Sequence, residues 1–338
     1  MKILVVASTM VHINNFHKEY IEALKEEGNQ VYVMAKGEGA DFNIPFEKKA
    51  LSLKNLSLVK EIKKILKEED FDVAYLHTTL AAFYVRLAMK GLKKRPFTVN
   101  TVHGYLFNKQ KRGLKGNLYL ACEKYVKGQT DVVITMNNED YEIATENKLS
   151  MGNIYKIAGM GIALPEIKPE RVPSKDGKIR LTFIGELSKR KNQEFLIRAI
   201  KDLSQYSLTL VGNGDMMEKL KALVKKLGME ERVVFAGHSK DVYFHLASTD
   251  IYVSASKIEG LPFNILEAMH MDLPILASNV KGHLDLLPED QLFEPDSYDD
   301  FKNKLLALSY GCNYSYDISR YKRENVFLQN LKIYKELK

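Results

Sequence analysis

Two carboxylates eight residues apart, Glu259 and Glu267, flank the turn with the clearest chemical signal in the chain. Gly260 and Pro262 predict a tight turn that opens onto a helix, and the apolar run at 250–254 predicts a buried parallel strand before it. A helix N-terminus after such a turn favours an anion, because backbone N–H groups point outward and the helix dipole adds about half a positive charge. The carboxylates would repel phosphate and are better suited to accept hydrogen bonds from hydroxyl groups. Phosphate and hydroxyls together indicate a sugar nucleotide.

A second segment concentrates positive charge. Lys189, Arg190 and Lys191 follow a strand predicted at 179–184, and they precede a helix for which Asn192 is a good capping residue. Cations at the entry to a helix suit a diphosphate, although a solvated basic loop is an equally common reason for such a run.

The glycine-rich turn after the strand at 207–211 includes Gly212 and would let backbone approach a ligand. Two glycines separated by one residue are a weak signal alone.

Another candidate, His103, ends the strand predicted at 98–102 and precedes Gly104, which permits a sharp chain reversal. A lone histidine is more often structural, but a strand end over the expected ligand crevice favours a functional role.

The first strand-to-helix loop holds His12, Asn14 and Asn15 and lacks the glycine pattern of a nicotinamide or flavin site. One of the two asparagines is expected to cap the helix at 15–28. This loop is a candidate for contacts with a ligand in the cleft.

These residues need a scaffold, and the chain alternates short apolar runs with amphipathic segments throughout. Such alternation predicts an α/β fold of two Rossmann-like, doubly wound parallel-sheet domains, with ligands in a cleft at the carboxyl ends of the strands. The predicted division is an N-terminal domain (1–163), a Pro-rich linker (164–178), a C-terminal domain (179–317) that carries the sugar-nucleotide signals, and a C-terminal helix (318–338) packing back on the first domain. Strands are expected at 3–7, 31–34, 73–76, 98–102, 132–135, 179–184, 207–211, 232–236, 250–254 and 274–278, and helices at 15–28, 55–69, 79–90, 114–127, 138–148, 192–203, 215–227, 240–247 and 264–271.

The formal net charge of +7 is concentrated in the first half, where residues 1–160 carry 24 Lys and Arg against 18 Asp and Glu. No acidic residue occurs between Asp72 and Glu123, a stretch rich in Lys and Arg. Such a stretch attracts an anionic partner or is simply a solvated surface, and without interleaved aromatic residues nucleic acid is not expected. Neither a signal peptide nor an 18-residue apolar segment is evident, so we expect a cytoplasmic protein. The two cysteines, Cys122 and Cys312, lack metal-ligand spacing and are expected to be reduced.

Taken together, the chain resembles the retaining glycosyltransferases of family 4, with their two-domain GT-B architecture, and particularly members that assemble bacterial capsule and exopolysaccharide. The resemblance covers almost the whole chain. It rests on Glu259 and Glu267 in an E-x7-E motif, on Lys191 in the basic loop, on the glycine turn at 211–214 and on the His103–Gly104 pair. Where relatives often have Arg after the loop glycine, this chain has Glu186, which removes a cation from the expected phosphate site.

By this resemblance, Lys191 and Arg190 would hold the donor diphosphate, Glu259 the transferred sugar and Glu267 the ribose. His103 would orient the donor sugar, which makes His103, Glu259 and Lys191 the expected catalytic residues. No metal and no cofactor beyond the nucleotide sugar are expected. The full expected donor-binding set is Gly185, Arg190, Lys191, Asn192, Gly212, Glu259, Gly260, Leu261, Phe263, Asn264 and Glu267.

The resulting hypothesis is a retaining hexosyltransferase that moves sugar from a nucleotide-diphosphate donor, expected to be a UDP-sugar, to a glycan or lipid-pyrophosphate-linked glycan. The alternatives are a sugar-nucleotide epimerase of the same architecture and a non-catalytic nucleotide-sugar-binding partner. The first domain is predicted to rest on the anionic inner face of the cell membrane, as a peripheral protein, through an amphipathic patch at 105–127. The cations of that patch are Lys109, Lys111, Arg112 and Lys115.

Overall fold

A computed structural model describes residues 1–47, 52–109, 112–174, 177–308, 310 and 314–336. The chain divides into two compact units. Unit 1 comprises residues 1–161 together with the C-terminal segment from residue 323, and unit 2 comprises Ile162–Lys322. Both are built on sheets whose recorded strand pairs are all parallel, which confirms the predicted pair of Rossmann-like folds.

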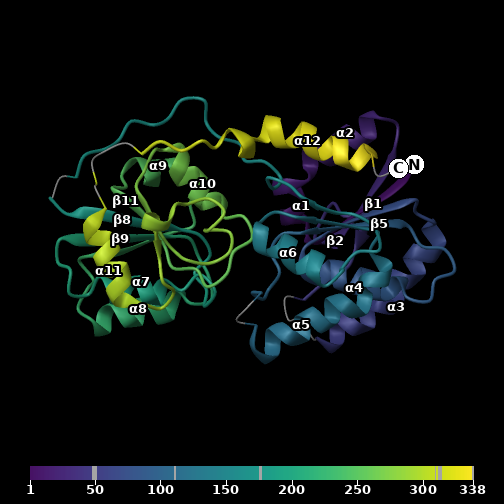
Figure 1. Ribbon diagram of the computed structural model, residues 1–338, viewed down its shortest axis with the longest axis horizontal. Coiled ribbons are helices and arrows are strands. Elements are labelled where there is room, and N and C mark those ends of the chain that lie inside the picture. Colours follow the sequence, from purple (N-terminus) through teal and green to yellow (C-terminus); the bar gives the residue numbers. More distant parts are fainter. Residues whose placement is uncertain (48–51, 110–111, 175–176, 309, 311–313, 337–338) are drawn as a thin grey trace. The chain divides into compact units, whose positions relative to one another are not determined.

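Unit 1 has the strand order β3-β2-β1-β4-β5-β6-β7. Helices flank its sheet in Figure 1. Its central strands are buried on both faces, as parallel strands covered by helices must be. On β4, Ala74 and Leu76 pack in the cluster formed with α3 and α4, whereas Tyr75 points to the other face and donates a hydrogen bond to the carbonyl of Tyr334 on α12 (3.3 Å). The strands are β1 (Lys2–Thr9), β2 (Gln30–Lys36), β3 (Phe42–Asn43), β4 (Val73–His77), β5 (Phe97–Val102), β6 (Val132–Thr135) and β7 (Ile154–Lys156), and the helices are α1 (Met10–Phe16), α2 (Lys18–Glu26), α3 (Leu53–Glu69), α4 (Thr79–Met89), α5 (Gly113–Val126), α6 (Asn138–Glu146) and α12 (Arg323–Glu336).

The C-terminal helix α12 is part of unit 1, although it follows unit 2 in the chain. Asn330, buried on α12, donates hydrogen bonds to the carbonyl of Gly159 (2.8 Å) and to the hydroxyl of Tyr20 (3.2 Å). The helix begins at Arg323 rather than at the predicted residue 318, because 319–321 form a separate 3₁₀ turn.

Unit 2 has the strand order β10-β9-β8-β11-β12-β13. Its core is one continuous apolar cluster in which Phe183 and Leu208 from the sheet pack with Leu196 of α7 and Leu220 of α8. The strands are β8 (Ile179–Ile184), β9 (Tyr206–Val211), β10 (Val233–Gly237), β11 (Ile251–Ser254), β12 (Ile275–Ser278) and β13 (Leu292–Phe293), and the helices are α7 (Gln193–Ala199), α8 (Met217–Lys226), α9 (Val242–Ala247), α10 (Phe263–His270) and α11 (Tyr298–Ala307).

The Pro-rich stretch predicted as a linker, 164–178, is packed on unit 2. The Val172 amide donates to the carbonyl of Ala247 (2.9 Å), and Arg171 donates to the carbonyl of Thr249 (2.7 Å). The boundary therefore falls between residues 161 and 162, slightly before the predicted 163, and the stretch follows the surface of unit 2 as far as it is described.

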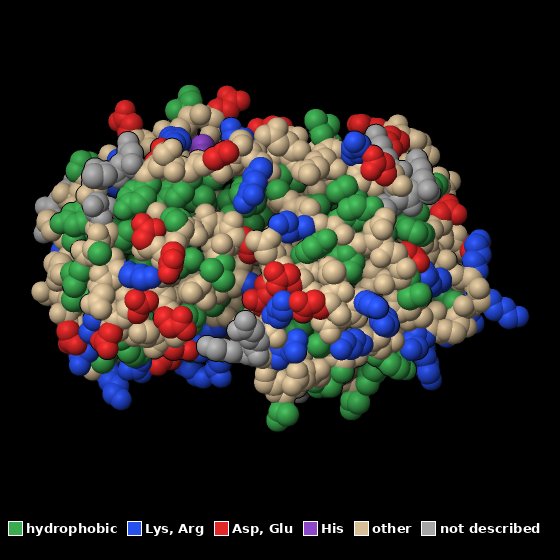
Figure 2. All heavy atoms as spheres, in the orientation of Figure 1, with side chains coloured by type: hydrophobic (Ala, Val, Ile, Leu, Met, Phe, Trp, Pro, Cys, Tyr) green, Lys and Arg blue, Asp and Glu red, His purple; other side chains and the backbone are tan. Residues whose placement is uncertain are grey.

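Across the described residues, no helix is both long enough and apolar enough to span a bilayer. On the face shown in Figure 2, acidic and basic side chains are interspersed.

Candidate active site

The turn at 259–262 joins β11 to α10 at the carboxyl edge of the unit 2 sheet. Pro262 occupies the N-cap position of α10 and makes no side-chain capping hydrogen bond. The N-terminus of a helix presents backbone donors and the positive end of the helix dipole. Asn264, in the first turn, donates its side-chain amide to the Ile184 carbonyl (2.8 Å) and the Tyr252 hydroxyl (2.7 Å), which fixes α10 against the end of β8.

Glu259 is buried and forms ion pairs with both neighbouring cations of the basic loop. Lys191 Nζ lies 2.6 Å from Glu259 Oε1, and Arg190 Nη1 lies 3.1 Å from Glu259 Oε2. Burial opposes the negative charge, but Lys191 and Arg190 outweigh it and hold the pKa of Glu259 at about 2. The carboxylate is thus ionised at neutral pH, and the predicted basic loop and E-x7-E motif meet in one constellation.

Glu267 has the opposite electrostatic character. It lies half-buried within α10, where desolvation raises its pKa to about 7. Among the described residues, no side chain or backbone group forms a recorded hydrogen bond with its carboxyl group. One motif therefore contains a carboxylate kept charged by cations and a second that is close to half protonated at neutral pH.

Lys191 is positioned by a tight loop after β8. Gln193 fixes that loop by donating to the Glu186 carbonyl (2.8 Å) and accepting from the Ser188 amide (3.2 Å). Asn192 adopts a left-handed backbone (φ 58°) at the start of α7, and its side chain makes no capping hydrogen bond, so the predicted capping role is wrong. Its contribution is instead the backbone conformation, which asparagine tolerates better than most residues.

Gly212 and Gly214 pack against the basic loop, where the sequence suggested that backbone would approach a ligand. A Cβ on Gly212 would lie 2.0 Å from the Gly185 carbonyl oxygen, and one on Gly214 would lie 2.1 Å from the Leu187 carbonyl oxygen. The Leu187 amide also donates to the Asn213 carbonyl (2.9 Å). These glycines therefore support the loop that carries Lys191.

Sequence reasoning missed the segment after β12. His283 is buried, which lowers its pKa, and it lies 3.3 Å from Ser254 Oγ and 2.8 Å from the Ser278 carbonyl. A Cβ on Gly282 (φ 83°) would lie 2.8 Å from the Gly260 carbonyl oxygen, so this loop packs directly on the E-x7-E turn. The available signal was the Lys-Gly-His run at 281–283, which begins three residues beyond the end of a buried strand.

In unit 1, His103 follows β5 as predicted and joins a group of histidine rings. His103 Nε2 lies 3.3 Å from His77 Nδ1, and its ring centroid lies 4.9 Å from that of His12. Burial, reinforced by the neighbouring His12 and His77, lowers the pKa of His103 well below its usual value. The ring is neutral at physiological pH.

The first loop differs from the prediction because α1 begins directly after β1. Thr9 caps α1 by accepting a hydrogen bond from the His12 amide (3.3 Å), so His12, Asn14 and Asn15 all lie on this helix. Neither asparagine caps a helix. Both line a hollow of unit 1 together with Arg323 of α12.

Much of the predicted basic surface is neutralised by acids that are distant in sequence. Buried Arg86 forms a two-fold ion pair with Glu123 (2.9 Å for both contacts), and Arg95 pairs with Asp131 (2.8 Å). The gap in acidic residues along the sequence is therefore not a gap in space.

The four cations assigned to a membrane patch differ in environment. Lys109 Nζ lies 2.8 Å from Glu142 and 2.6 Å from Glu146, and the hydrogen bonds that it donates to them raise its pKa. Lys111 lies outside the described residues. Arg112 and Lys115 form no ion pair within the described part of the chain, which leaves them as the cations of this surface.

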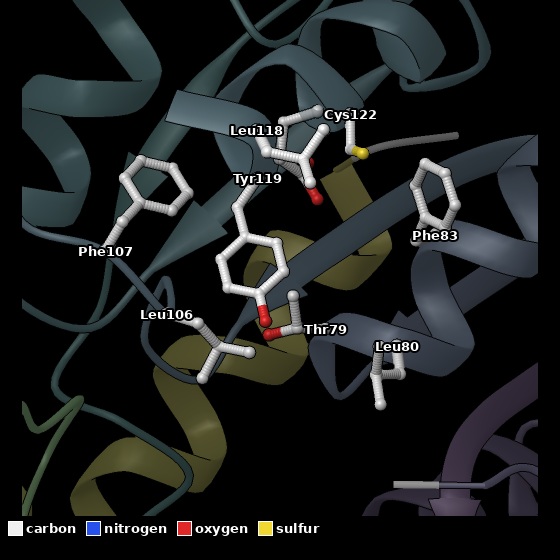
Figure 3. Close-up of a pocket in the computed structure, with 9 residues that line it drawn as sticks. Thr79, Leu80, Phe83, Leu106, Phe107, Leu118, Tyr119 and Cys122 are labelled. Carbon is white, nitrogen blue, oxygen red and sulfur yellow. The ribbon is translucent and has the colours of Figure 1, made fainter. Parts of the chain in front are cut away.

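Beside Lys115, an apolar pocket opens between α4, the 106–107 segment and α5 (Figure 3). Glu123 is one of the residues that line the pocket, and its carboxylate forms an ion pair with Arg86. The other residues that line the pocket are Thr79, Leu80, Phe83, Leu106, Phe107, Leu118, Tyr119 and Cys122. Cys312, the second cysteine, lies outside the described residues.

The arrangement of two parallel-sheet units, with cations and a helix N-terminus at the carboxyl edge of the second sheet, is that of the GT-B class of glycosyltransferases. Residues 13–154 match the family model "Glycosyltransferase Family 4", and residues 166–325 match "Glycosyl transferases group 1". The chain belongs to glycosyltransferase family 4 and is a glycosyltransferase.

Relatives and solved structures agree with this assignment. EpsD of Bacillus subtilis is 30% identical over 311 residues, which cover 86% of this chain and 82% of EpsD. An Escherichia coli UDP-Gal:α-D-GlcNAc-diphosphoundecaprenol α-1,3-galactosyltransferase is 27% identical over 281 residues, covering 76% and 72% of the two chains. The structure of Anabaena HepE in complex with UDP-glucose matches with a TM-score of 0.70 at 16% identity, over 99% of this chain and all of that one, which supports the fold.

Proposed function

We propose that this enzyme transfers a hexose from a UDP-sugar, with retention at the anomeric carbon, to a glycan or lipid-pyrophosphate-linked glycan during assembly of a bacterial surface polysaccharide. The observation that carries the proposal is the Lys191–Glu259–Arg190 constellation in the loops at the N-terminal end of α10. Relatives support the substrate class, because one is a galactosyltransferase named for UDP-Gal and a diphosphoundecaprenol-linked acceptor.

The donor diphosphate would be held by Lys191, Arg190 and the first turn of α10. A lysine ammonium has three donors, so Lys191 can keep its hydrogen bond to Glu259 and still donate to a phosphate oxygen. These fixed positive groups would stabilise the charge that develops on the departing diphosphate. No metal ion is required for this neutralisation.

Glu259 and Glu267 would then bind different parts of the donor. Glu259, ionised and fixed by two cations, would accept hydrogen bonds from hydroxyls of the transferred sugar. Glu267 lies about one turn into α10, and its carboxyl group forms no recorded hydrogen bond among the described residues, so that group is available to ribose hydroxyls. Retention would follow a front-face path in which the leaving phosphate accepts the acceptor proton as the new glycosidic bond forms.

For the acceptor, we propose that unit 1 rests on the anionic inner face of the cell membrane. Leu114 is 92% exposed and Leu118 45% exposed on α5, beside Arg112 and Lys115. Figure 2 shows hydrophobic side chains protruding at the lower edge of the view, where Figure 1 places α5. Exposed apolar residues beside unpaired cations suit the interface of an anionic bilayer. The apolar pocket beside this patch would accommodate part of the acceptor lipid.

The deciding experiment incubates the purified chain with a panel of nucleotide sugars, with and without a polyprenyl-pyrophosphate-linked sugar. We expect a new glycosidic product only when both substrates are present, with the donor's anomeric configuration by NMR. An epimerase would instead convert the donor sugar without acceptor. A non-catalytic binding partner would show donor-induced stabilisation without turnover. At a donor concentration of 100 times the dissociation constant, the free energy of unfolding would increase by about 2.7 kcal/mol, which is measured as a rise in melting temperature.

A further inference from the structure

Four of the chain's eight histidines form one cluster in unit 1, although they are far apart in sequence. The rings of His17 and His77 stack with centroids 3.7 Å apart, and the His12 ring lies 5.1 Å from that of His17. His103 completes the group, with its ring 5.5 Å from that of His77. Imidazole is the commonest protein ligand of transition metals.

Three of these rings converge on one point. His12, His17 and His103 each offer a ring nitrogen, and these three atoms lie within 4.8 Å of one another. A tetrahedral zinc ion with Zn–N distances of about 2.0–2.1 Å requires ligand nitrogens roughly 3.3 Å apart. Side-chain rotations that move the nitrogens by roughly an ångström would bring them to the spacing that zinc requires. His12 and His103 are only partly buried, so their side chains are less constrained than that of His17.

The nitrogens also lack other partners. His12 Nε2 and His17 Nε2 are both shielded from solvent and form no hydrogen bond within the described residues. A buried polar atom without a partner normally costs stability and is uncommon in folded proteins. A neutral imidazole ring has one nitrogen lone pair, which can bind a metal ion.

His77 is placed to orient the third ligand. Its Nδ1 lies 3.3 Å from His103 Nε2. When His103 donates this hydrogen bond, its Nδ1 carries the lone pair and can coordinate a metal. A hydrogen bond from the second nitrogen of a ligating histidine is the usual way in which proteins fix the tautomer and ring angle of metal ligands.

We propose that His12, His17 and His103 bind a transition-metal ion of the zinc class, with His77 as a positioning residue. Three imidazoles leave a fourth position for water or an exogenous ligand. All-nitrogen ligation excludes Mg²⁺ and Ca²⁺, which prefer oxygen. The ion would connect α1 and the α1–α2 junction to the end of β5. This inference does not depend on the proposed transfer reaction, and it gives His103 a role different from donor orientation.

The test uses the untagged full chain after treatment with EDTA. Isothermal titration with ZnCl₂ is expected to show one equivalent of binding and a rise in melting temperature, with no response to MgCl₂. Co²⁺ should give the intense visible absorption of a four-coordinate site. Absence of stoichiometric Zn²⁺ binding would overturn the proposal.

Substitutions locate the ion. His12→Gln and His103→Gln should each weaken Zn²⁺ binding by more than the roughly 10–100-fold that loss of an outer-shell partner costs. His238→Gln, at an exposed histidine of unit 2, is the matched control and should bind as wild type. Circular dichroism of each metal-free variant checks the fold. Undiminished Zn²⁺ affinity in folded His12→Gln would place the ion elsewhere and refute the site.

Discussion

Lys191 Nζ lies 2.6 Å from Glu259 Oε1, although 68 residues separate the two in the chain. Both side chains are almost fully buried, and Arg190 contacts the second oxygen of the same carboxylate. The free enzyme thus already holds the cations in position through the carboxylate proposed to bind the sugar. Each partner is therefore expected to contribute to folding and to chemistry, and the predictions below separate the two effects.

Replacing Lys191 by Ala should lower kcat about 100- to 1,000-fold, because a preorganised donor to the developing charge is lost, as when an oxyanion-hole donor is removed. Steady-state kinetics at saturating donor measure this. Lys189→Ala, which removes an exposed neighbouring cation, is the control and should retain near-normal kcat. A near-normal kcat for folded Lys191→Ala would disprove the assignment.

Lys191→Ala should also destabilise unit 2 by about 3–5 kcal/mol, because it leaves the buried Glu259 carboxylate with a weaker set of partners. The double variant Lys191→Ala/Glu259→Gln should recover much of that loss, since the buried charge is then removed. Urea denaturation of the single and double variants tests the coupling. Equal stabilities of the two variants would show that the pair contributes little to folding.

Glu267→Gln should make the enzyme more stable at alkaline pH. Burial raises the Glu267 pKa from 4.5 to about 7, so the folded carboxyl keeps its proton at pH values where the unfolded chain has lost it. Unfolding then releases a proton between pH 4.5 and 7, and the free energy of unfolding falls as pH rises through that window. A neutral glutamine avoids this loss, a gain of about 3 kcal/mol at pH 8. Wild-type and variant stability curves that stay parallel from pH 4.5 to 8 would contradict the prediction.

The two carboxylates should also differ in kinetics. Glu267→Ala is expected mainly to weaken UDP binding, since it removes contacts to the ribose. Glu259→Ala should mainly lower kcat, because the transferred sugar and the cations Lys191 and Arg190 are no longer held in position. Titration with UDP and steady-state kinetics distinguish the two effects. The opposite pattern would exchange the assigned roles.

Hydrophobic periodicity was sufficient to predict both parallel sheets, because buried parallel strands are continuous apolar runs such as 132–135. It missed β3, β7 and β13, which have only two or three residues each and too few positions to show a period. It also assigned most of α1 to a loop, because the predicted first helix, 15–28, corresponds to α2.

Candidate site residues were predictable from motif spacing, but their partners were not. The Lys191–Glu259 pair joins loops that only the sheet order brings together. Likewise, Arg86 and Arg95 looked unpaired along the sequence, yet Glu123 and Asp131 neutralise them across neighbouring elements. Charge counts along a chain describe a surface only where the fold keeps sequence neighbours together.

The membrane proposal separates cations that the sequence treated alike. Arg112→Gln/Lys115→Gln should weaken binding to anionic liposomes at low salt by about 1 kcal/mol per charge, because these side chains have no acidic partner among the described residues. Lys109→Gln is the matched control and should have little effect, since Glu142 and Glu146 already neutralise Lys109. Leu114→Gln should weaken binding at both low and high salt, because the exposed leucine contributes through apolar burial rather than charge. Sedimentation with vesicles that contain phosphatidylglycerol measures all three variants. Equal partitioning of wild type and Arg112→Gln/Lys115→Gln at low salt would refute a charge-assisted contact through α5.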